Sequence, residues 1–442
     1  MHVWANGAEI ITCGIAYVLG FFLPGYLFSR WLRSSAAILS GVVLSLVILC
    51  QGFFWLEVIG IPLQFWTMAV WELMWTGIAI WCVAVSRRDE NLKPKEANPN
   101  GLGAIGWILI GLAAVTGGIL LLRAWLVPLT GPDVENRWGL LARQVLRLGH
   151  YHFYPPRRAQ DYQYYGFPES LPPMLTAAMW WIYASLGRAV LKATAPFVAG
   201  QYAVLAGLVY RLTRRYASPT ASAMALALLA ATPLVFFSLV VGQEAGLVAI
   251  GAMAMLYFVL PGNDASDWRC AVLAGAAAAL GPLVREYALV FPILGLALAV
   301  GYRRPIRWMM IFCLSVAVLI LPWCARTWIL TGNPVYSLSL FGLFPVNPIV
   351  AAQYHIAAKS RSVWIIPAST WWMIGRLLLV LAPLPLIFGL PALIEAARQR
   401  RSLIVAFLVF FALWFVSLGL SDSLLMWTRT LLPAAAVLCV LI

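Results

Sequence analysis

A series of long, unbroken apolar runs constrains this chain more than any other feature. Of its 442 residues, 63% are hydrophobic and only 10% are charged. Runs of about 20 residues match the length of a helix that crosses a bilayer. Since lipid offers no hydrogen bonds, the backbone of such a run must bond within its own segment, as a helix does. The sequence therefore predicts an all-α, polytopic integral membrane protein.

The formal net charge of +14 comes from Lys and Arg residues that lie between the apolar runs. A nucleic-acid-binding protein would instead gather them on one soluble face, so we interpret them as topology signals. The seven cysteines include no CxxC pair, and most lie inside apolar runs: Cys13, Cys50, Cys82, Cys313 and Cys439. We therefore expect neither a disulfide framework nor a zinc site.

The basic clusters predict a topology of about 13 crossings. If Arg30 and Arg33 are cytoplasmic, helices near 35–59 and 63–86 return the chain to the basic segment 87–95, and a helix near 102–127 leads outward. The loop 128–170 is then external. Further crossings are expected near 193–212, 219–238, 242–260, 269–284, 286–302 and a run ending near 324.

This topology requires the apolar stretch 171–187 to be a juxtamembrane helix rather than a crossing. It also makes the stretch 326–370 a second external loop. We expect two parts of the chain, an N-terminal three-helix membrane segment with a cytoplasmic linker (1–101) and a catalytic transmembrane domain (102–442).

The external loop begins with an amphipathic pattern. After Asp133, Val134, Trp138, Leu141 and Val145 recur at helical spacing between basic residues, which predicts an interfacial helix. Asp133 could cap this helix, because Asp accepts the free amides of a first turn. Alternatively, its carboxylate serves as a general base at the membrane surface.

Aromatic residues dominate the rest of this loop, with Asp161 and Glu169 among them. Aromatic faces beside carboxylates suit sugar hydroxyls, although a membrane-interface belt also collects tyrosines. Both interpretations remain open at this stage.

Several segments resemble the GT-C membrane glycosyltransferases, in particular the protein O-mannosyltransferase and aminoarabinose transferase families. The resemblance begins with GPDVENRWGLLARQVLRLG and FPESLPPML in the external loop, and continues through GPLVREYALVFP, LPWCARTWILTGNPVY and LMWTRTLLP. It spans roughly residues 102–442 and leaves the first three helices uncovered. It implies a GT-C-like domain with juxtamembrane helices in the first large external loop.

The resemblance implies transfer of a sugar from a polyprenyl-phosphate carrier, with Asp133 as catalytic base. The family often has an acidic residue directly after this Asp, whereas here Val134 follows and Glu135 comes one position later. Glu135, Asp161 and Glu169 are therefore candidates for a second acid or for acceptor binding. A Lys that some relatives carry before the double proline is replaced by the sequence Glu169, Ser170, Leu171.

Basic residues on the predicted outer face are candidates for the lipid phosphate, whose negative charge grows as it departs. These are Arg137, Arg285, Arg326, Lys359, Arg361 and Arg429. Each could instead reach lipid headgroups as an ordinary interfacial side chain. Arg285 stands out because it and Glu286 lie where two apolar runs meet without a polar linker.

We expect no metal and no resident cofactor. His150 and His152 lack a third and a fourth ligand in the loop, although a divalent metal stays an open alternative. The expected partners are a polyprenyl-phosphate sugar donor, membrane lipids and a glycan, lipid or protein acceptor, with no nucleic acid. The expected location is a bacterial inner (plasma) membrane with the active site on its periplasmic, external face.

A membrane transporter or flippase of a lipid-linked or small polar substrate is the main alternative. Such a protein keeps ionisable residues within its spans, and Glu72 is one candidate, but no inverted repeat is evident. A lipid-phosphate hydrolase is a third possibility. Glu244 is expected on a short, solvated outer turn.

Overall fold

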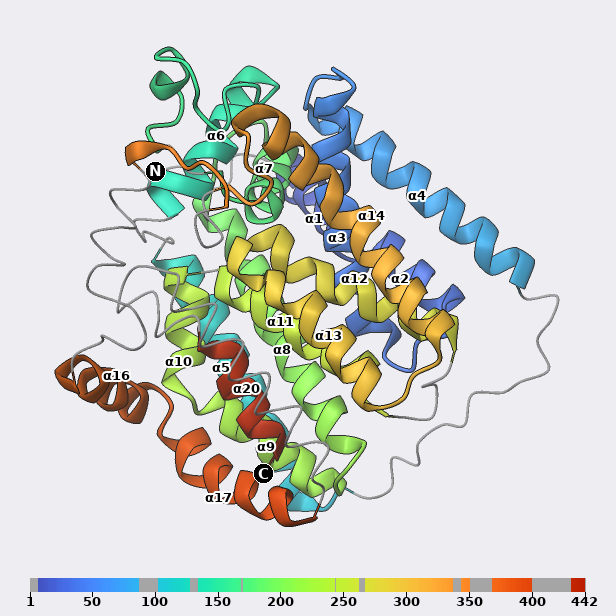
Figure 1. The fold of residues 1–442 in the computed structure, drawn as a ribbon, viewed down its shortest axis with the longest axis vertical. Coiled ribbons are helices and arrows are strands. Elements are labelled where there is room, and N and C mark those ends of the chain that lie inside the picture. The colour runs from blue at the N-terminus through green and yellow to red at the C-terminus, as the bar shows by residue number, and fades with distance from the viewer. Residues whose placement is uncertain are drawn as a thin grey trace.

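Helices are the only regular structure in the residues that the computed structural model describes, which confirms the all-α class (Figure 1). These residues are 7–86, 102–127, 134–167, 170–242, 244–261, 267–336, 343–349, 368–399 and 431–441.

The described helices before residue 215 are α1 (Gly7–Phe21), α2 (Leu23–Trp31), α3 (Ala37–Val58), α4 (Phe65–Ser86), α5 (Ala104–Leu126), the π-helix η2 (Val134–Trp138), α6 (Gly139–Leu148), the short 3₁₀ turn η3 (Asp161–Gln163), α7 (Met174–Leu186), the 3₁₀ turn η4 (Leu191–Thr194) and α8 (Ala195–Arg214).

Those after it are α9 (Pro219–Ala230), α10 (Pro233–Phe237), the π-helix η5 (Ser238–Gly242), α11 (Glu244–Val259), α12 (Trp268–Val284), the 3₁₀ turn η6 (Glu286–Leu289), α13 (Val290–Gly301), α14 (Ile306–Thr331), α16 (Ala368–Leu381), α17 (Pro383–Gln399) and α20 (Leu432–Leu441).

The helices α3, α4 and α5 lie where the apolar runs predict them. The N-terminal apolar run, residues Gly7–Trp31, is one span that is interrupted at Phe22 between α1 and α2, with Pro24 in the first turn of α2. The predicted span near 219–238 is broken: it bends by 56° between α9 and α10, where Pro233 starts a new helix. Proline permits these breaks because it lacks an amide hydrogen and its ring excludes the backbone of the preceding turn.

Six described helices, or seven if the bent pair counts as one span, are long and apolar enough to cross a membrane. The predicted count of about 13 crossings is therefore not confirmed. Several apolar runs form shorter helices, such as α11 with 16 residues and α12 with 17. Both are buried along nearly their whole length, so protein rather than lipid surrounds them.

The stretch predicted as a juxtamembrane helix forms α7. Its 13 residues are too few to cross a bilayer, as the prediction requires. However, all of them are buried, whereas a helix lying on the membrane surface would expose one face. The helix is apolar because it packs inside the bundle, against α1, α3 and α6.

The N-terminal helices pack directly on the rest of the bundle. In α1, the backbone oxygen of Ala16 accepts a hydrogen bond from Trp181 Nε1 at 2.8 Å, and Tyr17 Oη donates to the backbone oxygen of Ala193 at 2.7 Å. Helices α2 and α3 approach closely at Gly25, where an added Cβ would lie 2.1 Å from the Gly41 oxygen. Small residues permit such close packing of membrane helices. The division at residue 101 stays a prediction.

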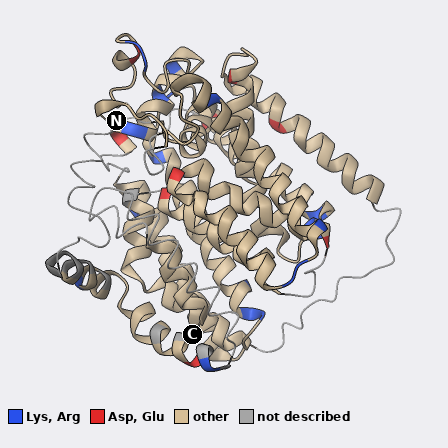
Figure 2. Cartoon of the chain, in the orientation of Figure 1, with Lys and Arg blue, Asp and Glu red and all other residues tan. Residues whose placement is uncertain are grey.

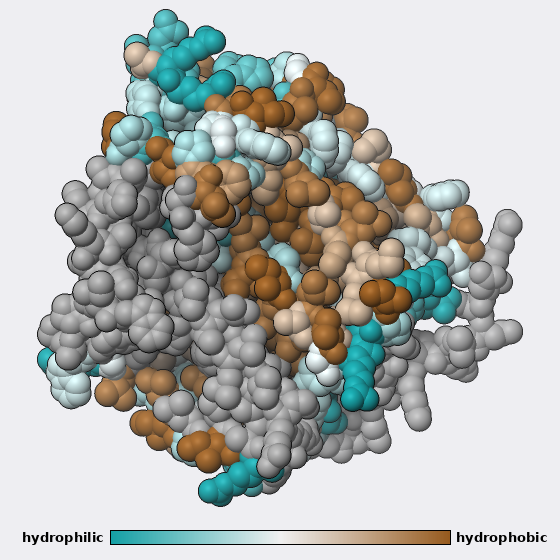
Figure 3. Space-filling model, in the orientation of Figure 1, coloured by the Kyte–Doolittle hydropathy of each residue, from teal (hydrophilic) through white to brown (hydrophobic). Residues whose placement is uncertain are grey.

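The long helix α14 runs diagonally from the upper part of the molecule toward its right-hand side in Figure 1. It begins just after Arg303 and Arg304, and its last turns reach the loop that follows α6, through Arg326. Figure 2 shows most basic residues at the top, at the right-hand side and at the bottom of the molecule. Figure 3 shows hydrophobic surface between hydrophilic regions at the top and at the lower right. This distribution fits a bundle embedded in a bilayer.

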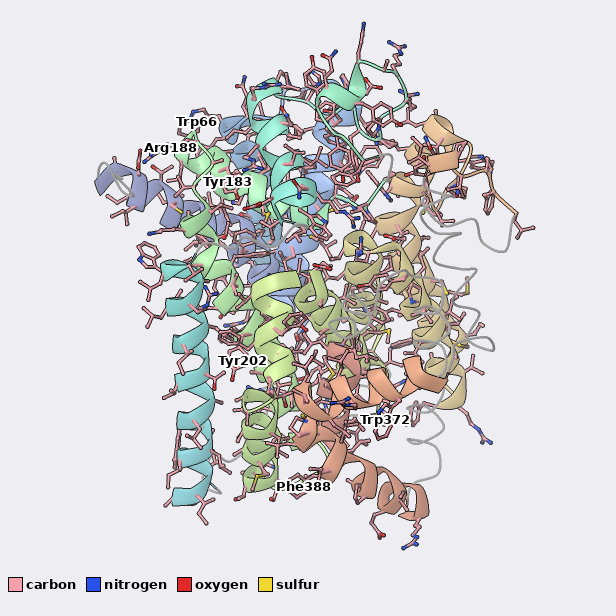
Figure 4. The ribbon with its side chains drawn as sticks, turned by 90° about the vertical axis from the view of Figure 1, so that its left-hand side faces the viewer. Trp66, Tyr183, Arg188, Tyr202, Trp372 and Phe388 are labelled. Atoms are coloured by element: carbon pink, nitrogen blue, oxygen red, sulfur yellow. The ribbon has the colours of Figure 1, made fainter. Side chains whose placement is uncertain are left out.

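The helix α5 stands at the edge of the bundle, where most of its surface is exposed. Tyr202 of α8 joins it to the core by donating a hydrogen bond to the Ala113 backbone oxygen at 2.9 Å (Figure 4). A buried hydroxyl needs such a partner in an apolar setting.

Candidate functional site

The segment directly after Asp133 begins as a π-helix, η2, and continues as α6. The predicted helix is therefore present, with Val134 and Trp138 buried at its start. A Cβ at Gly139 would lie 2.3 Å from the Val134 backbone oxygen, so glycine permits this wider turn. Single π turns occur frequently at functional sites.

Arg285 lies against this π-helix. It follows α12 with an extended backbone (φ −148°, ψ 135°), and its guanidinium carbon lies 5.5 Å from the ring centroids of both Trp138 and Tyr287. The residue is only 3% exposed. An arginine between aromatic faces is held by cation–π attraction. Arg285 therefore belongs to the protein interior and does not extend from the membrane boundary toward lipid headgroups.

Arg137 and Arg147 also stack on aromatic rings of the loop. The guanidinium of Arg137 lies 5.5 Å from the centroid of Phe167, and that of Arg147 lies 5.8 Å from the centroid of Tyr164. These contacts join the helix after Asp133 to the end of the loop. Arg137 remains a candidate for the lipid phosphate because it is half-buried on this helix.

The aromatic loop is mainly a packing element. Tyr151, Phe153, Tyr154 and Tyr165 are each at most 4% exposed, and Tyr154 Oη donates to the Leu171 backbone oxygen at 2.8 Å. These four rings therefore form neither an open platform for a sugar nor an interface belt. The sequence left sugar binding and an interface belt open for this loop, because composition alone does not show whether an aromatic ring is exposed or packed.

Two candidate acids have observed positions. The Oδ2 atom of Asp161 accepts hydrogen bonds from the amides of Arg157 at 3.0 Å and Arg158 at 2.9 Å, so Asp161 stabilises a turn of the loop. Glu135 is exposed on the π-helix. Any role of either residue as a second acid or in acceptor binding stays a prediction.

Arg326 lies within α14, which extends to Thr331, so the predicted second external loop does not begin at residue 326. Its guanidinium carbon lies 4.7 Å from the centroid of the Tyr151 ring, and Nη2 donates to the Tyr154 backbone oxygen at 2.7 Å. Burial raises the pKa of Tyr151 more than the nearby Arg326 lowers it, and the side chain is therefore a neutral phenol. Arg326 thus holds the loop, and phosphate binding by it stays a prediction.

Glu57 was not among the predicted site residues, yet it contacts the same loop. It is 4% exposed at the C-terminal end of α3, and it accepts a hydrogen bond from the Tyr151 amide. Its signal in the sequence is an acidic residue at the end of the apolar run near 35–59.

The structure corrects the expectation for Glu244. This residue is fully buried as the first residue of α11, not placed on a solvated turn. Gln201 of α8 lies beside the same helix end, because a Cβ at Gly246 would lie 2.3 Å from Gln201 Oε1. Sequence hydropathy does not reveal this burial, because a charged residue at the junction of two apolar runs looks like part of an exposed turn.

No group of three His, Cys, Asp or Glu side chains able to hold a metal occurs in the described part of the chain. The rings of His150 and His152 stack at 4.9 Å, and His152 Nδ1 lies 2.6 Å from Glu57 Oε1. The remaining predicted residues lie outside the described part: Asp133, Glu169, Lys359, Arg361 and Arg429.

Residues 170–328 match the family described as dolichyl-phosphate-mannose-protein mannosyltransferase. No curated protein and no solved structure matched the chain. The matched segment contains α7 to α13 and most of α14, and with them Arg285 and Arg326. Mannosyltransferases of this family use lipid-phosphate sugars and belong to the GT-C superfamily. The resemblance of this chain to the GT-C membrane glycosyltransferases is thereby confirmed for residues 170–328.

Proposed function

We propose that this chain transfers a sugar from a polyprenyl-phosphate carrier to a hydroxyl of a glycan, lipid or protein. The reaction takes place on the external face of a bacterial inner membrane, at the helix that follows Asp133. The family match supports a polyprenyl-phosphate-sugar-dependent glycosyltransferase in general. The charge distribution of the loops supports the external face.

In the proposed step, the acceptor hydroxyl oxygen attacks the anomeric carbon as the bond from that carbon to the phosphate oxygen breaks. The acceptor proton passes to Asp133, and the departing lipid phosphate keeps the bonding electron pair. A positioned carboxylate accelerates such an attack because a sugar hydroxyl is a poor nucleophile. Attack opposite the leaving group inverts the anomeric configuration.

The contact between Arg285 and Trp138 is the observation that carries this proposal. Arg285 belongs to the segment that matches the mannosyltransferase family, and Trp138 lies on the π-helix that begins one residue after Asp133. A guanidinium at this position could neutralise the phosphate while Asp133 accepts the proton. Positive charge held in a region of low water content stabilises a developing anion strongly.

The substitution Asp133→Asn tests the base. Asn is close to Asp in size and can still cap a helix, so folding and donor binding should survive. Asn cannot accept the acceptor proton, and loss of a general base typically lowers the rate by about 100-fold to 10,000-fold. The measurement is sugar transfer by purified protein supplied with polyprenyl-phosphate sugars and candidate acceptors.

Asp267→Asn is the matched control. Asp267 caps α12 by accepting a hydrogen bond from the Arg269 amide at 3.1 Å, so this variant makes the same change at an established cap. Its transfer rate should equal that of the wild type. If Asp133→Asn retained activity within about threefold, a barrier difference of about 0.7 kcal/mol, Asp133 would be a structural residue only.

Transport is the second candidate, because Glu72 is fully buried in the span α4 and neither carboxylate oxygen has a hydrogen-bond partner among the described residues. Ionisable residues inside spans often mark a transport pathway. Proteoliposomes with a lipid-linked sugar on one side distinguish the two functions. Movement of the intact lipid without sugar transfer would support a flippase and contradict the glycosyltransferase.

A further inference from the structure

Glu57 is a buried acid that the proposed reaction does not use. Its Oε1 atom accepts a hydrogen bond from the Tyr151 amide at 3.0 Å and lies 2.6 Å from His152 Nδ1. The side chain is 3% exposed, whereas that of His152 is 67% exposed. A buried carboxylate is costly unless hydrogen bonds compensate it. Both groups that compensate Glu57, the Tyr151 amide and the His152 side chain, belong to the loop after α6.

Arg326 holds the same segment from α14. Its Nη2 atom donates to the backbone oxygens of Tyr154 at 2.7 Å and Tyr151 at 3.5 Å. The Tyr151 ring lies parallel to Phe53 of α3, with centroids 5.0 Å apart and planes 5° apart. Because Arg326 also covers this ring, Tyr151 is enclosed between α3 and α14.

A third contact fixes the start of the segment. The Leu63 amide, in the turn between α3 and α4, donates to the Gly149 backbone oxygen at 2.7 Å. Gly149 ends α6 with a left-handed backbone (φ 72°) that suits glycine. Helices that lie far apart in the sequence thus hold residues 149–154, which directly follow the helix that begins after Asp133.

We propose that Glu57 is a positioning residue, which together with Arg326 holds residues 149–154 and so orients the helix after Asp133. Glu57 contacts no reacting atom in this proposal. The effect on reaction rate rests on the proposed function, whereas the holding of the loop does not. The N-terminal helices lie outside the segment that matches the family. In this proposal they help to position the active site, because Glu57 belongs to α3.

The amide of Tyr151, rather than the charge of His152, should carry most of this effect. His152 is largely exposed, and ion pairs with an exposed partner contribute little to stability. The Tyr151 amide is buried with its acceptor and would lose its partner without Glu57. Glu57→Gln keeps an oxygen acceptor, so it should preserve the loop, whereas Glu57→Leu removes the acceptor at similar size.

Hydrogen–deuterium exchange of the full chain in lipid nanodiscs tests the proposal without reference to activity. In Glu57→Leu, exchange of peptides covering residues 149–154 should rise by about tenfold or more, because the buried Tyr151 amide is left without its acceptor. Glu57→Gln should restore protection to within about threefold of the wild type. Peptides of α12 report whether each variant is folded.

The same variants are assayed for sugar transfer. Glu57→Leu should lower kcat by about tenfold or more while the donor KM changes by less than about threefold, because misorientation affects the transition state more than donor binding. Glu57→Gln should rescue kcat. The control Glu9→Gln alters another ion pair of the N-terminal helices, with Arg188 at 2.9 Å, and should change neither exchange of 149–154 nor kcat.

If Glu57→Leu does not fold, Arg326→Leu tests the same segment from α14 and should expose residues 149–154 in the same way. Unchanged exchange in these leucine variants, or equal exposure in Glu57→Gln and Glu57→Leu, would overturn the proposal. If the wild-type protein transfers no sugar, the proposed function fails, but the exchange experiment still decides whether Glu57 holds the loop.

Discussion

The buried charged residues around the helix after Asp133 and the loop that follows it are the most informative individual residues. Arg285 stacks on rings of the π-helix and of η6, while Arg326 and Glu57 bind backbone groups of the loop. Burying a charge is costly, so such residues are retained where a partner or a ligand compensates them. The partners of these residues differ: Arg285 contacts aromatic rings, whereas Arg326 and Glu57 hydrogen-bond to the backbone of the loop.

Arg285→Ala should lower the rate of sugar transfer by about 100-fold or more, because removing one preorganised donor to a developing anion typically has this effect. Arg269→Ala is the control. Arg269 stacks on Trp268 at the same 5.5 Å at the other end of α12, and its loss should leave transfer unchanged. Equal rates in the two variants would exclude Arg285 from phosphate stabilisation. The measurement is initial rate at saturating donor.

At the scale of elements, the π-helix η2 distinguishes the helix after Asp133 from an ordinary amphipathic helix. The wider turn brings the Val134 backbone oxygen against Gly139, where any side chain would collide with it. A π-helix is rarely stable by itself. Here Arg285 and α7 pack against it and support this geometry.

Gly139→Ala should therefore be destabilising, by about 1–3 kcal/mol, as overpacking in a filled region usually is. Gly200→Ala in α8 is the contrasting change, because no atom lies within 4 Å of a Cβ there. Alanine at that position should be neutral or stabilising by up to about 1 kcal/mol, since it favours helix more than glycine does. Thermal unfolding in detergent measures both, and a stable Gly139→Ala protein would argue against the importance of the π turn.

At the scale of the whole molecule, the long helix α14 determines which segments we expect on opposite sides of the membrane. Its 26 residues span about 39 Å, enough to cross a bilayer. Arg303 precedes its start, and its last turns contact the loop that contains Gln160. The loop should therefore face the side opposite to Arg303.

Single cysteines at Gln160 and Arg303 test this arrangement, because both positions are exposed. In intact cells, a membrane-impermeant maleimide should label the cysteine at 160 and reach the one at 303 only after the membrane is opened. A cysteine at Ser360 should react like that at 160 if the second loop is also external. Labelling of 160 and 303 from the same side would refute the topology and the external active site.

The sequence by itself determined the membrane class, the positions of α3, α4 and α5, and the helix after Asp133. Each depends on local hydropathy or on local periodicity, which the chain carries residue by residue. The resemblance to the GT-C glycosyltransferases also came from sequence, and the family match confirmed it over residues 170–328. The predicted number of crossings is not confirmed, because hydropathy does not distinguish a helix surrounded by lipid from one buried in protein, as α11 and α12 are.

Only the tertiary structure decided which polar groups meet. Glu57, Tyr151 and Arg326 lie far apart in the chain, and no local pattern indicates that they share one contact region. The burial of α7 and Glu244 likewise depends on neighbouring helices rather than on their own residues. Composition sets the preference of each segment for an apolar environment, but packing between distant helices decides which segments are enclosed and which charges are brought together.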